Sequence, residues 1–405
     1  MLRRPLLQGK EASVLFRIPQ KIRFLGCFYI LVLLLYSMTT LYNSVMPLYL
    51  KSFSPALRGV LLSAGPVVSS MAPLFWGSMA DRVRNKKWVL AAVCCGASLI
   101  FPLIFRQQGF WPILFLIGLT AFFSSSFGSL SDTITLSYCT QNGFSYGPVR
   151  IMGTVGYGIF AVVSGIIMEQ KEGLLPWIYF MLGAATVLVV FFLPSSGPEA
   201  SQSQKKAVFS FSDFRALFRE VPLLPCFMAL IFMTHFPLSY FYNFYPAFFV
   251  EELHFPERIW GILILATVSG EIPFFIFYDR LLKQVKIRTL FLVSGVLAVI
   301  RYTSFMLASG LTAIILTAVC TGLLTTIVIY SITWYINTRL PENRRATAQG
   351  AIYCTCSVTS VTAGLIGGAA TGLVGVRGMM AFCVFLSLGA LILVSVLSRK
   401  GKLDF

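Results

Sequence analysis

The chain of 405 residues is 57% hydrophobic and only 12% charged, and its mean hydropathy is +0.80. This composition is too apolar for a soluble domain of such length, so we expect an integral membrane protein. The formal net charge of +17 could suggest a nucleic-acid binder, but the placement of the basic residues, described below, has a different explanation.

Windows of about 20 apolar residues predict an all-α membrane protein with twelve transmembrane helices. The expected spans are 22–50, 57–79, 88–105, 110–138, 149–168, 174–194, 222–250, 257–279, 287–308, 312–338, 346–373 and 376–397. The basic start of the chain resembles a signal peptide, but its apolar run extends past Tyr42 and lacks a small-residue cleavage pattern, which favours a first span.

The 32 Lys and Arg residues alternate with these spans. Most lie in the two tails and the even-numbered connections, few lie in the odd-numbered connections, and Arg301 lies inside a span. The positive-inside rule therefore predicts that both termini are cytoplasmic in a multi-pass protein of the plasma or inner membrane. The basic excess indicates topology and contact with membrane lipids, and predicts no nucleic-acid partner.

The middle of the chain divides it into two halves. Between 195 and 221 the sequence is rich in Ser, Gln and Lys, a composition typical of a cytoplasmic linker. We expect a tail at 1–21, six-helix bundles at 22–194 and 222–397, and a second tail at 398–405.

Two short patterns recur in the two halves at nearly the same spacing. Tyr42, Asn43 and Pro47 in the first span correspond to Tyr242, Asn243 and Pro246 in the seventh. Asp81 and Arg82 after the second span correspond to Asp279 and Arg280 after the eighth. Such repeats predict pseudo-symmetric bundles with a site between them, as in many secondary transporters.

The loop after the second span carries the most specific motif. The segment from Gly77 through Asp81 and Arg82 to Lys87 resembles the signature of the major facilitator superfamily, Gly-x-x-x-Asp-Arg-x-x-x-basic-basic. Gly77 would allow close helix approach, and Asp81 could form a latch that is made in one conformer and broken in another. The alternative is that the basic residues only anchor topology. The resemblance implies gating roles for Gly77, Asp81, Arg82, Asp279 and Arg280.

The segment from Phe144 to Tyr157 resembles the lactose permease and phenylpropionate permease group of that superfamily. In the second half, several short stretches resemble the phenylpropionate permease pattern: Ser269 to Pro273, Asp279 to Leu282, Arg301, Leu340 to Glu342 and Arg345 to Gly350. This resemblance covers nearly the whole chain from Phe24 onward. It implies proton-coupled movement of a small organic solute by alternating access.

Three charged residues, Asp132, Glu271 and Arg301, lie inside apolar spans, where an unpaired charge costs roughly 2.5 to 3.5 kcal/mol. The resemblance makes Asp132 and Arg150 an acidic and basic pair for the solute, and the two could pair across a cavity. Tyr157 lies two helical turns after Arg150 and could stack on the solute. Structural roles are the alternative for each.

Glu271 and Arg301 lie on antiparallel neighbours and could form a buried pair, which the resemblance makes a proton or solute residue and its tuning partner. His235 titrates in a range suited to proton traffic, although a histidine in a helix is more often a core residue. The tenth helix carries Thr321 and Leu324 where the resembling permeases have a histidine and a glutamate, so proton coupling depends on Glu271.

Asn43 and Asn243 are uncharged candidates for the solute site, with interhelical hydrogen bonding as the alternative. Gly364, Gly368 and Gly372 form one small face that would let a neighbouring helix approach.

We therefore predict a monomeric secondary transporter for an aromatic acid, sugar or nucleoside, driven by protons, with no cofactor or metal. An uncoupled facilitator, an efflux carrier and a non-transporting receptor are the alternatives. A membrane-embedded enzyme is disfavoured, because the two histidines and the dispersed acidic residues offer no catalytic pair.

Overall fold

The computed structural model describes residues 20–194, 218, 221–307 and 310–399. Within these helices, the side chains of residues 273–283, 320, 321, 323, 325, 342, 343 and 346 are not described. Most of the predicted tails and most of the predicted linker lie outside the described residues.

The described part of the chain is almost entirely helical, because a backbone in lipid must satisfy its own hydrogen bonds. The first half contains α1 (Gln20–Tyr49), η1 (Leu50–Ser52), α2 (Pro55–Ser69), α3 (Ala72–Arg82), α4 (Lys87–Ile104), α5 (Phe110–Ser124), α6 (Phe127–Asn142), α7 (Tyr146–Lys171), η2 (Glu172–Leu174) and α8 (Leu175–Phe192). The second half contains α10 (Leu224–Glu251), α11 (Glu257–Gln284), α12 (Ile287–Leu307), α13 (Leu311–Thr321), α14 (Leu323–Arg339) and α15 (Glu342–Arg399).

Proline marks several helix starts. Pro55, Pro73, Pro176 and Pro225 lie in the first turns of α2, α3, α8 and α10, where the missing amide hydrogen has no helical partner to lose.

The helix breaks differ from the predicted span boundaries. The predicted spans 57–79, 110–138 and 312–338 are each divided, into α2 with α3, α5 with α6 and α13 with α14. The predicted spans 346–373 and 376–397 instead run together as α15, which bends at Gly375 with φ of 71°, a left-handed conformation that glycine adopts without steric cost. Hydropathy windows detect apolar runs and do not detect these backbone breaks.

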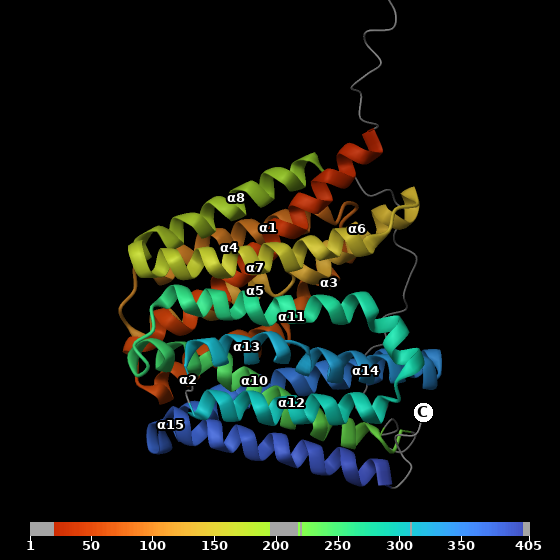
Figure 1. The fold of residues 1–405 in the computed structure, drawn as a ribbon. Helices are drawn as coiled ribbons and strands as arrows, with labels where there is room; N and C mark the ends of the chain where they lie inside the picture. Colours follow the sequence, from red (N-terminus) through yellow and green to blue (C-terminus); the bar gives the residue numbers. More distant parts are fainter. Residues whose placement is uncertain (1–19, 195–217, 219–220, 308–309, 400–405) are drawn as a thin grey trace, which may run out of the picture.

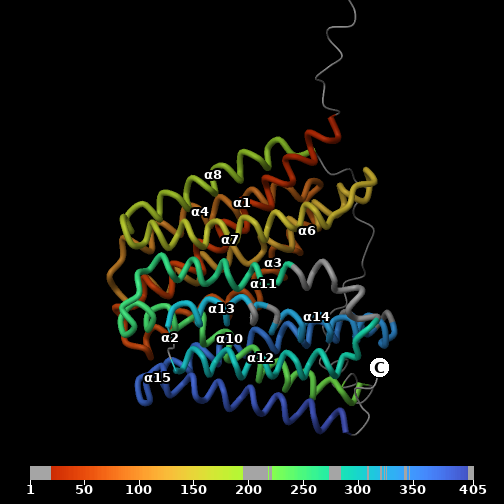
Figure 2. Tube along the Cα trace, viewed as in Figure 1, coloured from red at the N-terminus to blue at the C-terminus, as the bar shows by residue number. Residues whose placement is uncertain are grey.

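The helices gather into two groups (Figures 1 and 2). Most helices of the first half occupy the upper part of the view and helices of the second half the lower part, whereas α2 of the first half lies among the lower helices. The halves are joined mainly where α7 packs on α11 and α2 packs on α15, and α10 also contacts both α1 and α2. The start of α1 and the end of α15 lie toward the same end of the bundle.

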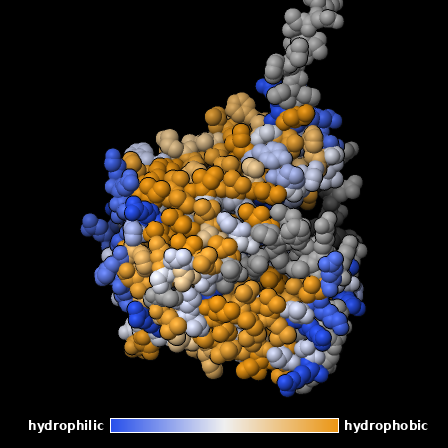
Figure 3. All heavy atoms as spheres, in the orientation of Figure 1, coloured by the Kyte–Doolittle hydropathy of each residue, from blue (hydrophilic) through white to orange (hydrophobic). Residues whose placement is uncertain are grey.

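The surface agrees with a membrane protein. Hydrophobic residues cover the middle of the visible face, and hydrophilic residues gather at its two ends (Figure 3). Eight helical stretches of the described chain are long and apolar enough to cross a membrane.

Candidate functional site

A cavity of about 310 Å³ lies between the two halves, and we call it the central cavity. Its polar lining comes from α1, α7, α10 and α15: Tyr42, Asn43, Tyr157, His235, Ser239, Tyr242, Asn243 and Ser360. A second space of about 500 Å³, the adjoining cavity, shares Tyr42, Asn43, Gly65, Pro66 and Ser360 with it. Both volumes are in the range of pockets for small organic ligands.

Four residues chosen from the sequence line the central cavity: Asn43, Tyr157, His235 and Asn243. Asn43 is exposed although it lies within the apolar helix α1, because its side chain borders the hollow between the halves. Tyr157 of α7 faces Asn43. The repeated Tyr-Asn pairs of α1 and α10 therefore meet at one site.

Ser360 of α15 is the centre of a small polar group. Its hydroxyl lies 3.3 Å from Nε2 of His235 and 3.1 Å from the hydroxyl of Ser239. His235 Nδ1 is buried without a hydrogen-bond partner. Nothing in the sequence singled out Ser360 or Ser239, because serine is common in the packed helices of membrane proteins.

The expected direct pair of Asp132 and Arg150 is not formed. The hydroxyl of Tyr146 donates a hydrogen bond of 2.7 Å to Asp132 Oδ1, and the Arg150 guanidinium lies over the Tyr36 ring, 4.4 Å from its centre. Within the described residues no ion pair joins the two groups, because each has an aromatic partner in its place. Tyr36 lines the adjoining cavity, so Arg150 is separated from that cavity by the Tyr36 ring.

Glu271 and Arg301 lie behind the cavity wall. The two are within electrostatic reach of each other, and Glu271 also faces Thr326. Arg301 is 1% exposed, and its guanidinium lies 4.9 Å from the centre of the Phe241 ring. Arg301 also faces Tyr242 of α10, which lines the central cavity. The charged pair of Glu271 and Arg301 therefore lies next to the part of the lining that the second half supplies.

The predicted gating residues have mixed outcomes. Asp81 forms an ion pair of 3.5 Å with Lys86 of its own loop. A Cβ at Gly77 would meet no atom within 4 Å, so the close helix approach that we expected there is wrong for this conformer. Arg82 is exposed, and the side chains of Asp279 and Arg280 lie outside the described residues.

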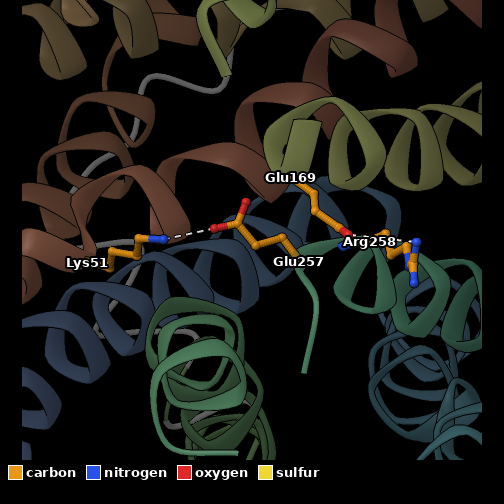
Figure 4. A network of polar contacts seen from close by, with 4 residues as sticks. All are labelled: Lys51, Glu169, Glu257 and Arg258. Atoms are coloured by element: carbon orange, nitrogen blue, oxygen red, sulfur yellow. Dashed lines mark hydrogen bonds and ion pairs between the residues drawn. The ribbon is translucent and has the colours of Figure 1, made fainter. Parts of the chain in front are cut away.

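The two halves are joined at one end by charged contacts (Figure 4). Lys51 Nζ donates a hydrogen bond of 2.8 Å to Glu257 Oε1, and Arg258 Nη1 lies 3.7 Å from Glu169 Oε1. The backbone amide of Arg258 also donates to Glu169 Oε2 at 3.3 Å. Each contact crosses from the first half to the second. We call the end of the bundle that holds these four residues the closed end.

Small residues bring the backbones together near the closed end. A Cβ on Gly59 of α2 would overlap the Gly364 carbonyl of α15, and one on Gly261 of α11 would overlap the Ala161 carbonyl of α7. A Cβ on Gly368 would lie 2.6 Å from the Pro55 carbonyl and 3.0 Å from Gly59 Cα. The predicted small face of α15 therefore packs on the other half through Gly364 and Gly368, whereas Gly372 is open.

The site suits binding better than bond-making chemistry. In the part of the chain that the structure describes, no group of three or more His, Cys, Asp and Glu side chains could hold a metal ion. The lining offers hydroxyls, amides and rings from both halves, arranged around a space large enough for a small organic molecule.

Comparisons with known proteins agree with this architecture. A family model described as "MFS_1 like family" matches residues 25–387. "Uncharacterized transporter YwbF" of Bacillus subtilis is 27% identical over 72% of this chain and 71% of its own. "Probable 3-phenylpropionic acid transporter" of Escherichia coli is 24% identical over 62% of this chain and 65% of its own. The solved structure of the nucleoside transporter NupG has a TM-score of 0.79 at 18% identity and covers 95% of this chain and 100% of that one.

Proposed function

We propose, from the premise that the chain belongs to the MFS_1-like family of the major facilitator superfamily, that it carries a small organic solute by alternating exposure of the central cavity. The chain is a secondary transporter and its relatives are transporters, not enzymes. The observation that carries the proposal is the shared wall of the cavity, because a site built by both halves changes its access when the halves rock against each other.

We count twelve spans in the proposed topology. The pairs α2 with α3, α5 with α6 and α13 with α14 each form one interrupted span, and α15 forms two spans joined at Gly375. Interrupted helices at membrane depth are tolerated where protein or a cavity covers them. With both termini on the basic cytoplasmic side, the closed end faces outward.

In this orientation the described conformer is closed to the outside. Transport then requires that the contacts of Lys51 with Glu257 and of Glu169 with Arg258 break while the opposite end closes. The Asp81 loop is the proposed latch at that opposite end, together with Gly77, Arg82, Asp279 and Arg280. Such interfaces have two discrete arrangements, which suits a two-state gate.

We assign solute contacts to Asn43, Asn243 and Tyr157 in the wall. Arg150 acts at the adjoining cavity through Tyr36, and Asp132, which Tyr146 holds by a hydrogen bond, acts on the same tyrosine electrostatically. We assign proton coupling to Glu271, with Arg301 beside it and His235 in the wall. A carboxylate placed behind the solute site can bind a proton in one conformer and release it in the other when its surroundings change.

Uptake into proteoliposomes with and without an imposed pH gradient tests this function. We expect solute accumulation above the external concentration only when the gradient is present. Equal final ratios with and without the gradient would leave transport in place and replace symport with facilitated diffusion. Binding without any translocation would overturn the transport proposal itself.

A further inference from the structure

The lining of both cavities carries no formal charge within the described residues. Its polar members are tyrosines, asparagines, serines, one threonine and His235, and no Asp, Glu, Lys or Arg is among them. From this we infer that the transporter carries a neutral solute with a ring face and several hydrogen-bonding groups, and rejects carboxylate anions. The inference rests on the proposed transport function and narrows its substrate class.

The nearby charges are balanced before a solute arrives. Arg150 and Asp132 both lie within electrostatic reach of Tyr36 and of Tyr330, so neither acts on that region alone. Arg301 lies within reach of Glu271 in the same way. An anionic solute would add a negative charge to a region where each arginine already has a carboxylate nearby, Asp132 in the surroundings of Arg150 and Glu271 in those of Arg301. Burying a charge that no partner compensates is unfavourable.

The lining instead offers both donors and acceptors. Asn43 and Asn243 approach from opposite halves, and an amide both donates and accepts hydrogen bonds. Ser239 and Ser360 add hydroxyls that can take either role. This set matches hydroxyl groups and heterocyclic amides, which also donate and accept, better than it matches a carboxylate, which only accepts.

Rings complete the recognition surface. Tyr42, Tyr157 and Tyr242 line the central cavity, and each offers a flat apolar face with a polar tip. Nucleosides and glycosides share the required chemistry, a ring face bordered by hydroxyls. A phenyl-substituted acid has the ring without the neutral polar rim.

The first test compares three probes on the purified full-length chain at neutral pH: uridine, maltose and 3-phenylpropionate. We expect uridine or maltose to raise the melting temperature with a saturating dose dependence, because a ligand that binds the folded state stabilises it. The expected result for 3-phenylpropionate is no shift. A shift for 3-phenylpropionate equal to or larger than that of both neutral probes would overturn the inference.

Two variants connect the probe to the cavity. N243L removes the amide at nearly constant size, and we expect the affinity for the neutral probe to fall at least about tenfold, as for lost buried hydrogen bonds. The matched control is N337L on the exposed face of α14, which is expected to bind as the wild type does. S360A provides a second, smaller change in the wall, expected to weaken binding several-fold. Wild-type affinity in both N243L and S360A would place the solute elsewhere and sink the inference.

Tracer uptake separates this inference from the proposed function. If uridine or maltose binds but does not enter liposomes, the substrate class holds and the transport proposal fails. If 3-phenylpropionate enters at neutral pH and both neutral probes do not, the transport proposal holds and the neutral class fails.

Discussion

The closed end and the central cavity differ in how the same two halves meet. At the closed end, backbone touches backbone through Gly59 and Gly364, and charged pairs cross the interface. At the central cavity, the facing Tyr-Asn pairs of α1 and α10 leave a space of about 310 Å³. The halves are therefore held together at one level and separated at another, which is the arrangement that rocking about a central site requires.

The largest effect should come from G368V. A Cβ at Gly368 meets the Pro55 carbonyl and Gly59 of the other half, so valine would prevent the closed end from closing. Overpacking of this kind costs about 1–3 kcal/mol or more, which shifts the ratio of the two conformers roughly tenfold or beyond. We expect tracer uptake to fall by at least about tenfold.

The matched control for this change is G372V, one turn further along α15. A Cβ there meets nothing within 4 Å, so uptake should remain near the wild-type rate. Equal losses in both variants would mean that valine harms α15 generally and that the closed end does not depend on the Gly368 contact.

A second change acts behind the cavity. E271Q keeps the shape of Glu271 and removes its ability to exchange a proton, so it should abolish accumulation driven by a pH gradient while solute binding remains. The measurement is the final accumulation ratio in liposomes, expected to approach one. If the variant still concentrates solute as the wild type does, the coupling role moves away from Glu271.

The smallest effect concerns the charged contacts of the closed end. The side chains of Lys51 and Glu257 are 36% and 13% exposed, and partly exposed pairs contribute about 0.2–1 kcal/mol. K51M should therefore change the ratio of the two conformers by no more than about fivefold. The measurement is the accessibility of a cysteine introduced into the central cavity. K171M, at an exposed lysine of the same end, should have no effect.

Charge reversal at Lys51 should have a larger effect than its neutralisation. K51E alone should open the closed end more than K51M, because Glu172 and Glu257 lie within electrostatic reach of each other and of Lys51. Adding E257K should restore closure in part. A double variant no better than K51E would show that this pair does not hold the end together.

The sequence predicted what depends on local composition. Apolar runs indicated the helices, the loop from Gly77 to Lys87 and the other matching segments indicated the family, and the repeated Tyr-Asn pairs indicated where the halves meet. Asn43, Asn243, Tyr157 and His235 do line one cavity. A polar residue in an apolar helix is detectable because lipid penalises it unless a cavity or partner receives it.

The rest depends on how distant helices pack. Lys51 and Glu257 are far apart in the chain, and each looks like an ordinary solvated charge, Lys51 in a short connection and Glu257 at the start of a helix. Ser239 and Ser360 meet His235 only after α10 and α15 come together. Asp132 contacts Tyr146, and Arg150 contacts Tyr36. These partners depend on the geometry of the packed side chains.

In the proposed mechanism the two ends of the bundle open and close in opposition. Distances between pairs of spin labels measure this motion in a variant whose native cysteines have been replaced. One pair is attached at Ser52 and Glu252, which are exposed near the closed end. The other pair is attached at Arg84 and Lys286, which are exposed near the opposite end. With a transported solute present, we predict that a population appears with a longer Ser52 to Glu252 distance and a shorter Arg84 to Lys286 distance. Distances that stay fixed, or that lengthen together, while the solute is carried would contradict the account.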